Sequence, residues 1–157
     1  MGIYRYERRL TLAIEGPEGI RQSKLILQEN KTRLLEYAEY LKAARKSLPR
    51  QDKLIRTLKT YATLLGPIPF KKATKKDVVH VMAKAEDHWK TELSKKHRPG
   101  PASDYTRRDF QEIVKMFYGW LFDVEDPRHE GYPKVVSWIH SKAPKSKLKA
   151  SDLLAPN

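Results

Sequence analysis

The chain has 157 residues, of which 39% are hydrophobic and 32% charged, and it includes eight Tyr, four Phe and three Trp. This length and apolar content suffice for one domain with its own core and exclude full disorder. Because there is no Cys, disulfides, thiol catalysis and Cys-based zinc sites are excluded. No apolar run is long enough to cross a bilayer, and residues 1–15 lack the apolar core of a signal peptide, so we expect an intracellular, cytoplasmic protein.

The net charge of +13 is concentrated in parts of the chain. From Lys42 to Lys76 there are eleven Lys or Arg and a single acid, Asp52, and Lys142–Lys149 adds four lysines with no acid. Such clusters repel one another in a compact protein unless a polyanion binds there. The alternative is a solvated surface that serves solubility, but the clustering favours nucleic acid.

Apolar residues recur at helical spacing along most of the chain. They predict helices over residues 4–14, 23–46, 50–65, 74–93 and 103–121, and a short helical turn over 133–140. Breaks fall at Gly16-Pro17, Pro49 and Gly66-Pro67, where Gly and Pro end helices. No segment alternates with a two-residue period for long, so the expected fold is all-α, an orthogonal bundle of four to five main helices.

The segment 103–121 combines a regular apolar stripe with an unusual beginning. The stripe predicts a helix with Phe117, Tyr118 and Trp120 in the core and not as platforms for bases. Its first turns, however, carry Arg107 and Arg108, where the positive end of the helix dipole favours acids. Both arginines make better sense if a phosphate or a guanine edge lies beside them.

Residues that could carry catalysis are few. His80 and His88 lie two helical turns apart, too far for one metal ion, and there is no HExxH, P-loop or Gly-rich dinucleotide turn. The acids next to His88 are expected on a solvated helix face, and the acidic stretch 123–130 is expected to be a loop cap. We therefore expect no metal, no cofactor and no enzymatic activity from this polypeptide alone.

An ordered series of segments resembles a known family. The series comprises "YERRL" (6–10), "LILQENKTRLLEYAEYLKA" (25–43), "QDKLIRTLKTYATLLG" (51–66), "FKKATKKDV" (70–78), "SDYTRRDFQEIVKMFYGWL" (103–121) and "YPKVVSWIHSK" (132–142). Together they are similar to the N-terminal core-binding, SAM-like domain of tyrosine recombinases (phage-type integrases), most closely the archaeal ones. No single motif is diagnostic, and the specific signal is their order.

The resemblance implies sequence-directed binding of double-stranded DNA in integration and recombination, by a nucleoid-associated protein. It implies a DNA-clamping domain over residues 1–140 and a basic linker over 141–157 that leads to the protein's own C-terminal catalytic domain. The full-length family members assemble as tetramers on DNA, whereas the isolated domain is expected to be a monomer. The expected DNA-binding residues lie on the two helices and in the basic segments: Arg50, Lys53, Arg56, Lys59, Lys71, Lys72, Ser103, Thr106, Arg107, Arg108, Lys115, Lys142, Lys145 and Lys147.

The chain also departs from the family. The catalytic Arg, Lys, His-x-x-Arg and Tyr set has no counterpart, and the sequence stops after "SDLLAPN", which suggests a fragment without the strand-cutting domain. Two alternatives stay open. One is a complete, non-catalytic DNA- or RNA-binding regulatory or nucleoid-type protein, and the other is a protein-binding module for an acidic partner.

Overall fold

The computed structural model describes residues 2–141 of the chain, and within that range every regular element is helical. The all-α prediction is therefore confirmed, whereas the finer SAM-like assignment stays a prediction. The elements are α1 (Gly2–Glu15), α2 (Gln28–Ala43), α3 (Leu48–Leu65), a 3₁₀ turn η1 (Phe70–Lys72), α4 (Lys75–Lys95), α5 (Asp104–Leu121), α6 (Pro127–Glu130) and α7 (Lys134–Ser137).

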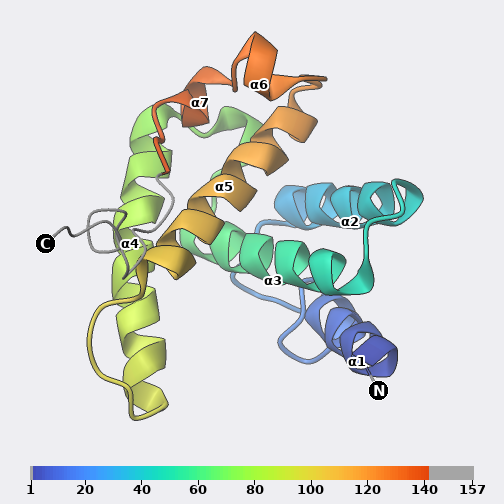
Figure 1. The fold of residues 1–157 in the computed structure, drawn as a ribbon, viewed down its shortest axis with the longest axis vertical. Coiled ribbons are helices and arrows are strands. Elements are labelled where there is room, and N and C mark those ends of the chain that lie inside the picture. Colours follow the sequence, from blue (N-terminus) through green and yellow to red (C-terminus); the bar gives the residue numbers. More distant parts are fainter. Residues whose placement is uncertain (1, 142–157) are drawn as a thin grey trace, which may run out of the picture.

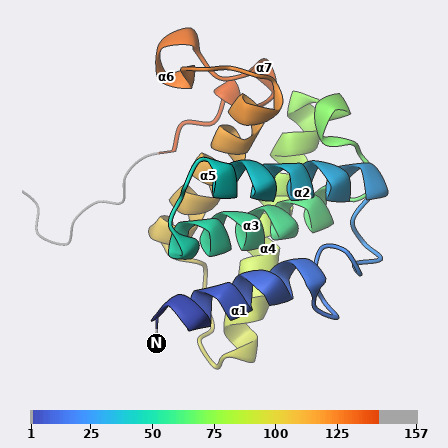
Figure 2. The same cartoon turned by 90° about the vertical axis from the view of Figure 1, so that its right-hand side faces the viewer.

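Helix α3 lies at the centre of the arrangement. It runs between α1 and α2, with α2 on one side and α1 on the other (Figures 1 and 2). Helices α4 and α5 cross beside α3, and the short α7 contacts both of them (Figure 1). The central position of α3 explains why six of its apolar residues are buried: Leu54, Ile55, Leu58, Tyr61, Ala62 and Leu65.

The core follows the predicted apolar stripes. On α5 the six residues of the stripe are all buried: Phe110, Ile113, Val114, Phe117, Tyr118 and Leu121. Phe117 packs edge-to-face against Phe70 with ring centroids 4.8 Å apart, and Trp120 is partly buried against the same core. The prediction that Phe117, Tyr118 and Trp120 belong to the core is confirmed, and Trp138 also packs against it.

Local signals set several helix starts. Ser103 accepts a hydrogen bond from the Thr106 N–H at 3.2 Å, and Thr74 and Asp77 form a reciprocal capping box at the start of α4. These bonds hold the pKa of Asp77 below its ordinary value. Gly66 ends α3 with a positive φ of 71°, a conformation that glycine adopts at low cost.

The predicted helix over 23–46 was wrong at its start. Helix α2 begins at Gln28, because Ser23 accepts a hydrogen bond from the Leu25 N–H at 3.2 Å and this local turn competes with helical bonding. Ile26 is still buried, but from a loop. A buried Asn30 in α2 then bonds the Ile68 carbonyl and the Phe70 N–H, both at 2.8 Å, and ties the α3–η1 loop to α2.

Smaller boundaries also differ from the prediction, since α2 ends at Ala43 and not at 46, and α3 begins at Leu48 and not at 50. Helix α4 continues to Lys95, beyond the predicted end at 93. The acidic stretch 123–130, expected to be a loop cap, contains the short helix α6, which begins with Pro127, where the missing N–H costs nothing. The turn predicted over 133–140 is helical only over Lys134–Ser137. The predicted linker over 141–157 lies outside the described residues, apart from its first residue.

Candidate nucleic-acid interface

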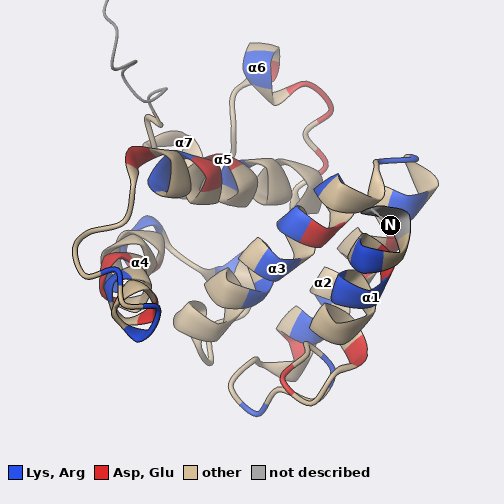
Figure 3. Cartoon of the chain, turned by 60° about the horizontal axis from the view of Figure 1, so that its bottom comes forward, with Lys and Arg blue, Asp and Glu red and all other residues tan. Residues whose placement is uncertain are grey.

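A hollow of about 740 Å³ opens between α1, α3, α4 and α5. We call it the central groove and define it by six lining residues: Arg9, Lys53, Arg56, Lys59, Trp89 and Thr106. Figure 3 shows Lys and Arg positions along both α1 and α3, the helices that contribute Arg9, Lys53, Arg56 and Lys59 to the hollow. Four of the residues predicted to bind DNA, from two separate helices, therefore reach one hollow: Lys53, Arg56, Lys59 and Thr106.

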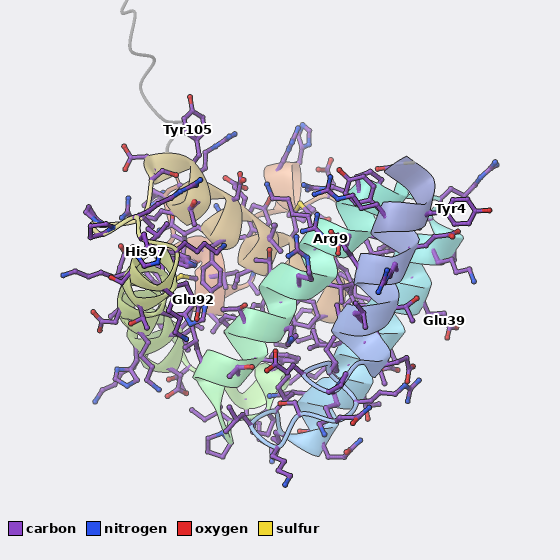
Figure 4. The ribbon with its side chains drawn as sticks, turned by 90° about the horizontal axis from the view of Figure 1, so that it is seen from below. Tyr4, Arg9, Glu39, Glu92, His97 and Tyr105 are labelled. Atoms are coloured by element: carbon purple, nitrogen blue, oxygen red, sulfur yellow. The ribbon has the colours of Figure 1, made fainter. Side chains whose placement is uncertain are left out.

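A buried carboxylate holds two of the cations at the groove. Asp52 on α3 is only 2% exposed and pairs with Arg56 at 3.0 Å, one turn later on the same helix. Arg9 of α1 reaches the other Asp52 oxygen at 3.6 Å, and Figure 4 shows the Arg9 side chain between α1 and α3. A buried charge is costly unless it is paired, so this contact both ties α1 to α3 and positions two guanidinium groups.

The remaining groove cations are more open. Lys53 pairs with Asp109 of α5 at 2.5 Å, but the two side chains are 49% and 38% exposed. Lys59 has no carboxylate within ion-pair distance among the described residues. Lys53 uses one of its three N–H donors and the Arg56 contact uses Nε, so donors remain for a further anion.

The groove continues into a neighbouring hollow of about 500 Å³ beside α1. The two hollows share Arg9, Arg56 and Lys59, and Leu12 and Ala13 also line the second one. The three shared cations therefore stand at the junction of the two hollows. This arrangement gives a positive track along the line where α1 meets α3.

At the start of α5, Arg107 has partners within the protein. The Arg107 guanidinium donates to both carboxylate oxygens of Glu86, at 2.6 and 2.7 Å, and to Asp104 at 2.8 Å. These contacts lower the pKa of Glu86 and raise that of Arg107. Arg107 is thus explained by a bidentate pair that links α5 to α4, with no phosphate required, and Glu86 is not simply on a solvated face.

Arg108 and Arg50 are placed differently from the groove cations. Arg108 is half-buried and has no ion-pair partner within residues 2–141. Arg50 lies at a second hollow, beside Tyr40 and Trp120, where its Nη2 is 3.7 Å from the Met116 sulfur. The structure therefore does not bring Arg50 together with Lys53, Arg56 and Lys59.

The other predicted residues are dispersed. Lys71 and Lys72 are exposed in η1, and the Ser103 hydroxyl accepts a hydrogen bond that caps α5. Lys115 donates to the Ile139 carbonyl at 3.0 Å and lies 4.6 Å from the Tyr132 ring centroid, so it holds the segment around α7. Lys142, Lys145 and Lys147 lie outside the described residues.

The lining residues that the sequence did not predict include Tyr6, Arg9, His88 and Trp89. Arg9 and Tyr6 belong to a short basic and aromatic stretch, which was a usable signal. His88 and Trp89 fall on the edge of the α4 core stripe, and only the crossing of α4 and α3 places them at the groove.

Metal-binding groups and membrane-spanning helices are both absent from the described part of the chain. Within residues 2–141 no group of three His, Asp or Glu side chains could hold a metal ion. None of the helices in that range combines the length and the apolar character that a membrane span requires.

Comparison of the chain with protein-family models, with curated proteins and with solved structures finds no match. The resemblance to the core-binding domain of tyrosine recombinases therefore rests on the sequence segments alone.

Proposed function

We propose that the chain binds double-stranded DNA through the central groove and the α1 and α3 surfaces beside it. The observation that carries this proposal is the convergence of four cations, Arg9, Lys53, Arg56 and Lys59, on one hollow that holds only two carboxylates. Lys and Arg contacts to phosphates supply most of the affinity of such an interface and make it depend on salt. The charge of +13 supports the same partner.

The role of this DNA binding follows from the resemblance. We propose that the chain is the DNA-clamping half of a site-specific tyrosine recombinase. This part has a separate test. If it is correct, the reading frame that continues beyond residue 157 encodes an Arg, a His-x-x-Arg and a Tyr in that order. A continuation without them would leave a DNA-binding protein that is no recombinase.

DNA binding is tested with a pair of matched double variants. Lys53→Gln/Lys59→Gln removes two groove charges but leaves Arg9 and Arg56 on the buried Asp52. Lys24→Gln/Lys42→Gln removes two exposed charges that line none of the described hollows. Fluorescence anisotropy of a labelled duplex is then followed as salt is raised.

The groove variant should bind more weakly, and its slope of log affinity against log salt should be shallower by about 2, near 0.9 per lost phosphate contact. The control should keep most of the wild-type slope. Equal slopes for the two variants would move the interface away from the groove. No binding of any duplex at low salt would refute DNA binding altogether.

A further inference from the structure

The central groove is a hollow and not a flat basic surface. A duplex backbone can be held by cations on an even surface, because phosphates lie on the outside of the duplex. A volume of about 740 Å³ lies within the range of pockets that enclose small organic ligands. The hollow therefore has room for a group that enters it, such as a nucleobase.

Planar rings line the hollow from two helices that flank α3. Tyr6 comes from α1, and His88 and Trp89 come from α4, which lies on the other side of α3 in Figure 4. All three are half-buried, so part of each ring is open to the groove. Trp89 is held edge-to-face against Phe110 with centroids 5.2 Å apart, and the Arg9 guanidinium lies 5.9 Å from the Tyr6 ring centroid.

Polar groups between these rings suit the edge of a base. Thr57 and Thr60 of α3 and Thr106 of α5 also line the hollow. The Thr60 hydroxyl donates to the Arg56 carbonyl and the Thr106 hydroxyl bonds that of Ser103, and both oxygens can still accept. Asp109 adds an acceptor for an exocyclic amino group. Lys59, without an ion-pair partner among the described residues, stands at the junction of the two hollows, where the phosphate of an inserted nucleotide would lie.

We propose that the central groove takes up an unpaired nucleobase of the bound DNA, stacked on Tyr6 and the His88–Trp89 wall, with its phosphate on Lys59 and Arg56. This inference rests on the proposed DNA binding and goes beyond it. Base–aromatic stacking tolerates any base, because every base has a π-face. A base already unpaired costs less to insert than one that must first leave its pair, so DNA with an unpaired nucleotide is the preferred ligand.

The test compares two duplexes that differ in one nucleotide. One carries 2-aminopurine as a single-nucleotide bulge, and the other has the same 2-aminopurine paired with thymine. Wild-type protein should bind the bulged duplex about tenfold more tightly, the equivalent of one stacking contact. Its fluorescence should fall on binding, because 2-aminopurine is quenched when it stacks on an aromatic ring.

Tyr6→Leu and Tyr4→Leu serve as the matched pair of variants. Tyr4 lies on the same helix but is 81% exposed and points away from the groove (Figure 4). Tyr6→Leu should reduce the ratio of bulged to paired affinity to about twofold or less and weaken the quenching, since one stacking contact is lost. Tyr4→Leu should keep the wild-type ratio.

The possible results separate the two proposals. Equal affinity for bulged and paired duplexes, without quenching, overturns the base-binding inference and leaves DNA binding standing. A bulge preference that Tyr6→Leu does not change overturns its assignment to this groove. Failure to bind either duplex at low salt overturns both proposals.

Discussion

Substitution of Arg107 and of Arg108, neighbours at the start of α5, distinguishes an effect on folding from an effect on DNA binding. We consider Arg107→Ala and Arg108→Ala as a matched pair, because each removes one positive charge at the same end of the same helix. Arg107 makes three short hydrogen bonds to Glu86 and Asp104, whereas Arg108 has no ion-pair partner within the described range. The two substitutions should therefore have different effects on stability.

The cost of Arg107→Ala follows from the geometry of the pair. Side chains of Arg107 and Glu86 are 31% and 40% exposed, so solvent screens their attraction. An exposed pair is worth up to about 1 kcal/mol, and bidentate geometry puts this one at the upper end. A loss of about 1 kcal/mol should lower the Tm by about 3 °C in a domain of this size. Arg108→Ala should leave the Tm close to that of the wild type.

The effect should depend on pH in a defined direction. Arg107 holds the pKa of Glu86 below its ordinary value of 4.5, so ionised Glu86 is favoured in the folded state. The stabilisation is complete above the ordinary pKa and is lost as the pH falls through the lowered folded pKa. The Tm difference between wild type and Arg107→Ala should therefore be present at neutral pH and disappear in acid.

Differential scanning fluorimetry at several pH values measures this effect, with duplex affinity measured well below the Tm. We expect the affinity of Arg107→Ala to stay within about twofold of Arg108→Ala, because both lose one charge near the groove and only the long-range field changes. If Arg107→Ala keeps the wild-type Tm while its affinity alone collapses, Arg107 contacts DNA and the pairing with Glu86 does not explain its position.

Two further changes test other contacts. Asp109→Asn removes the carboxylate that pairs with Lys53 at 2.5 Å. Because this exposed pair is worth less than about 1 kcal/mol, duplex affinity in the anisotropy assay should rise about two- to threefold. A fall in affinity would show that the Asp109 charge does not weaken the interaction of Lys53 with phosphate. Asn30→Ala leaves the Ile68 carbonyl and the Phe70 N–H unpaired in the core, and urea unfolding should show a loss of about 2–4 kcal/mol. Stability within error of the wild type would mean that Asn30 does not hold the α3–η1 loop.

The sequence predicts best the features that depend on residues close together in the chain. The apolar period of 103–121 predicted which side of α5 is buried, because positions three and four apart share one face of any α-helix. The Thr74–Asp77 capping box is equally local, since donor and acceptor lie within one turn. The start of α2 was missed where another local interaction, the Ser23 turn, replaced helical bonding.

Charge and periodicity by themselves determined that the chain is helical, strongly basic and rich in cations along the segment that forms α3. Tertiary structure alone decided which of those cations act together. Arg9 meets Asp52, and Arg107 meets Glu86, because α1 lies along α3 and α5 crosses α4. The angles between helices result from the fit of whole side-chain surfaces, which no local pattern encodes. The same angles open a hollow between four helices and bring Lys53, Arg56 and Lys59 to it, while Arg107 pairs with Glu86 outside it.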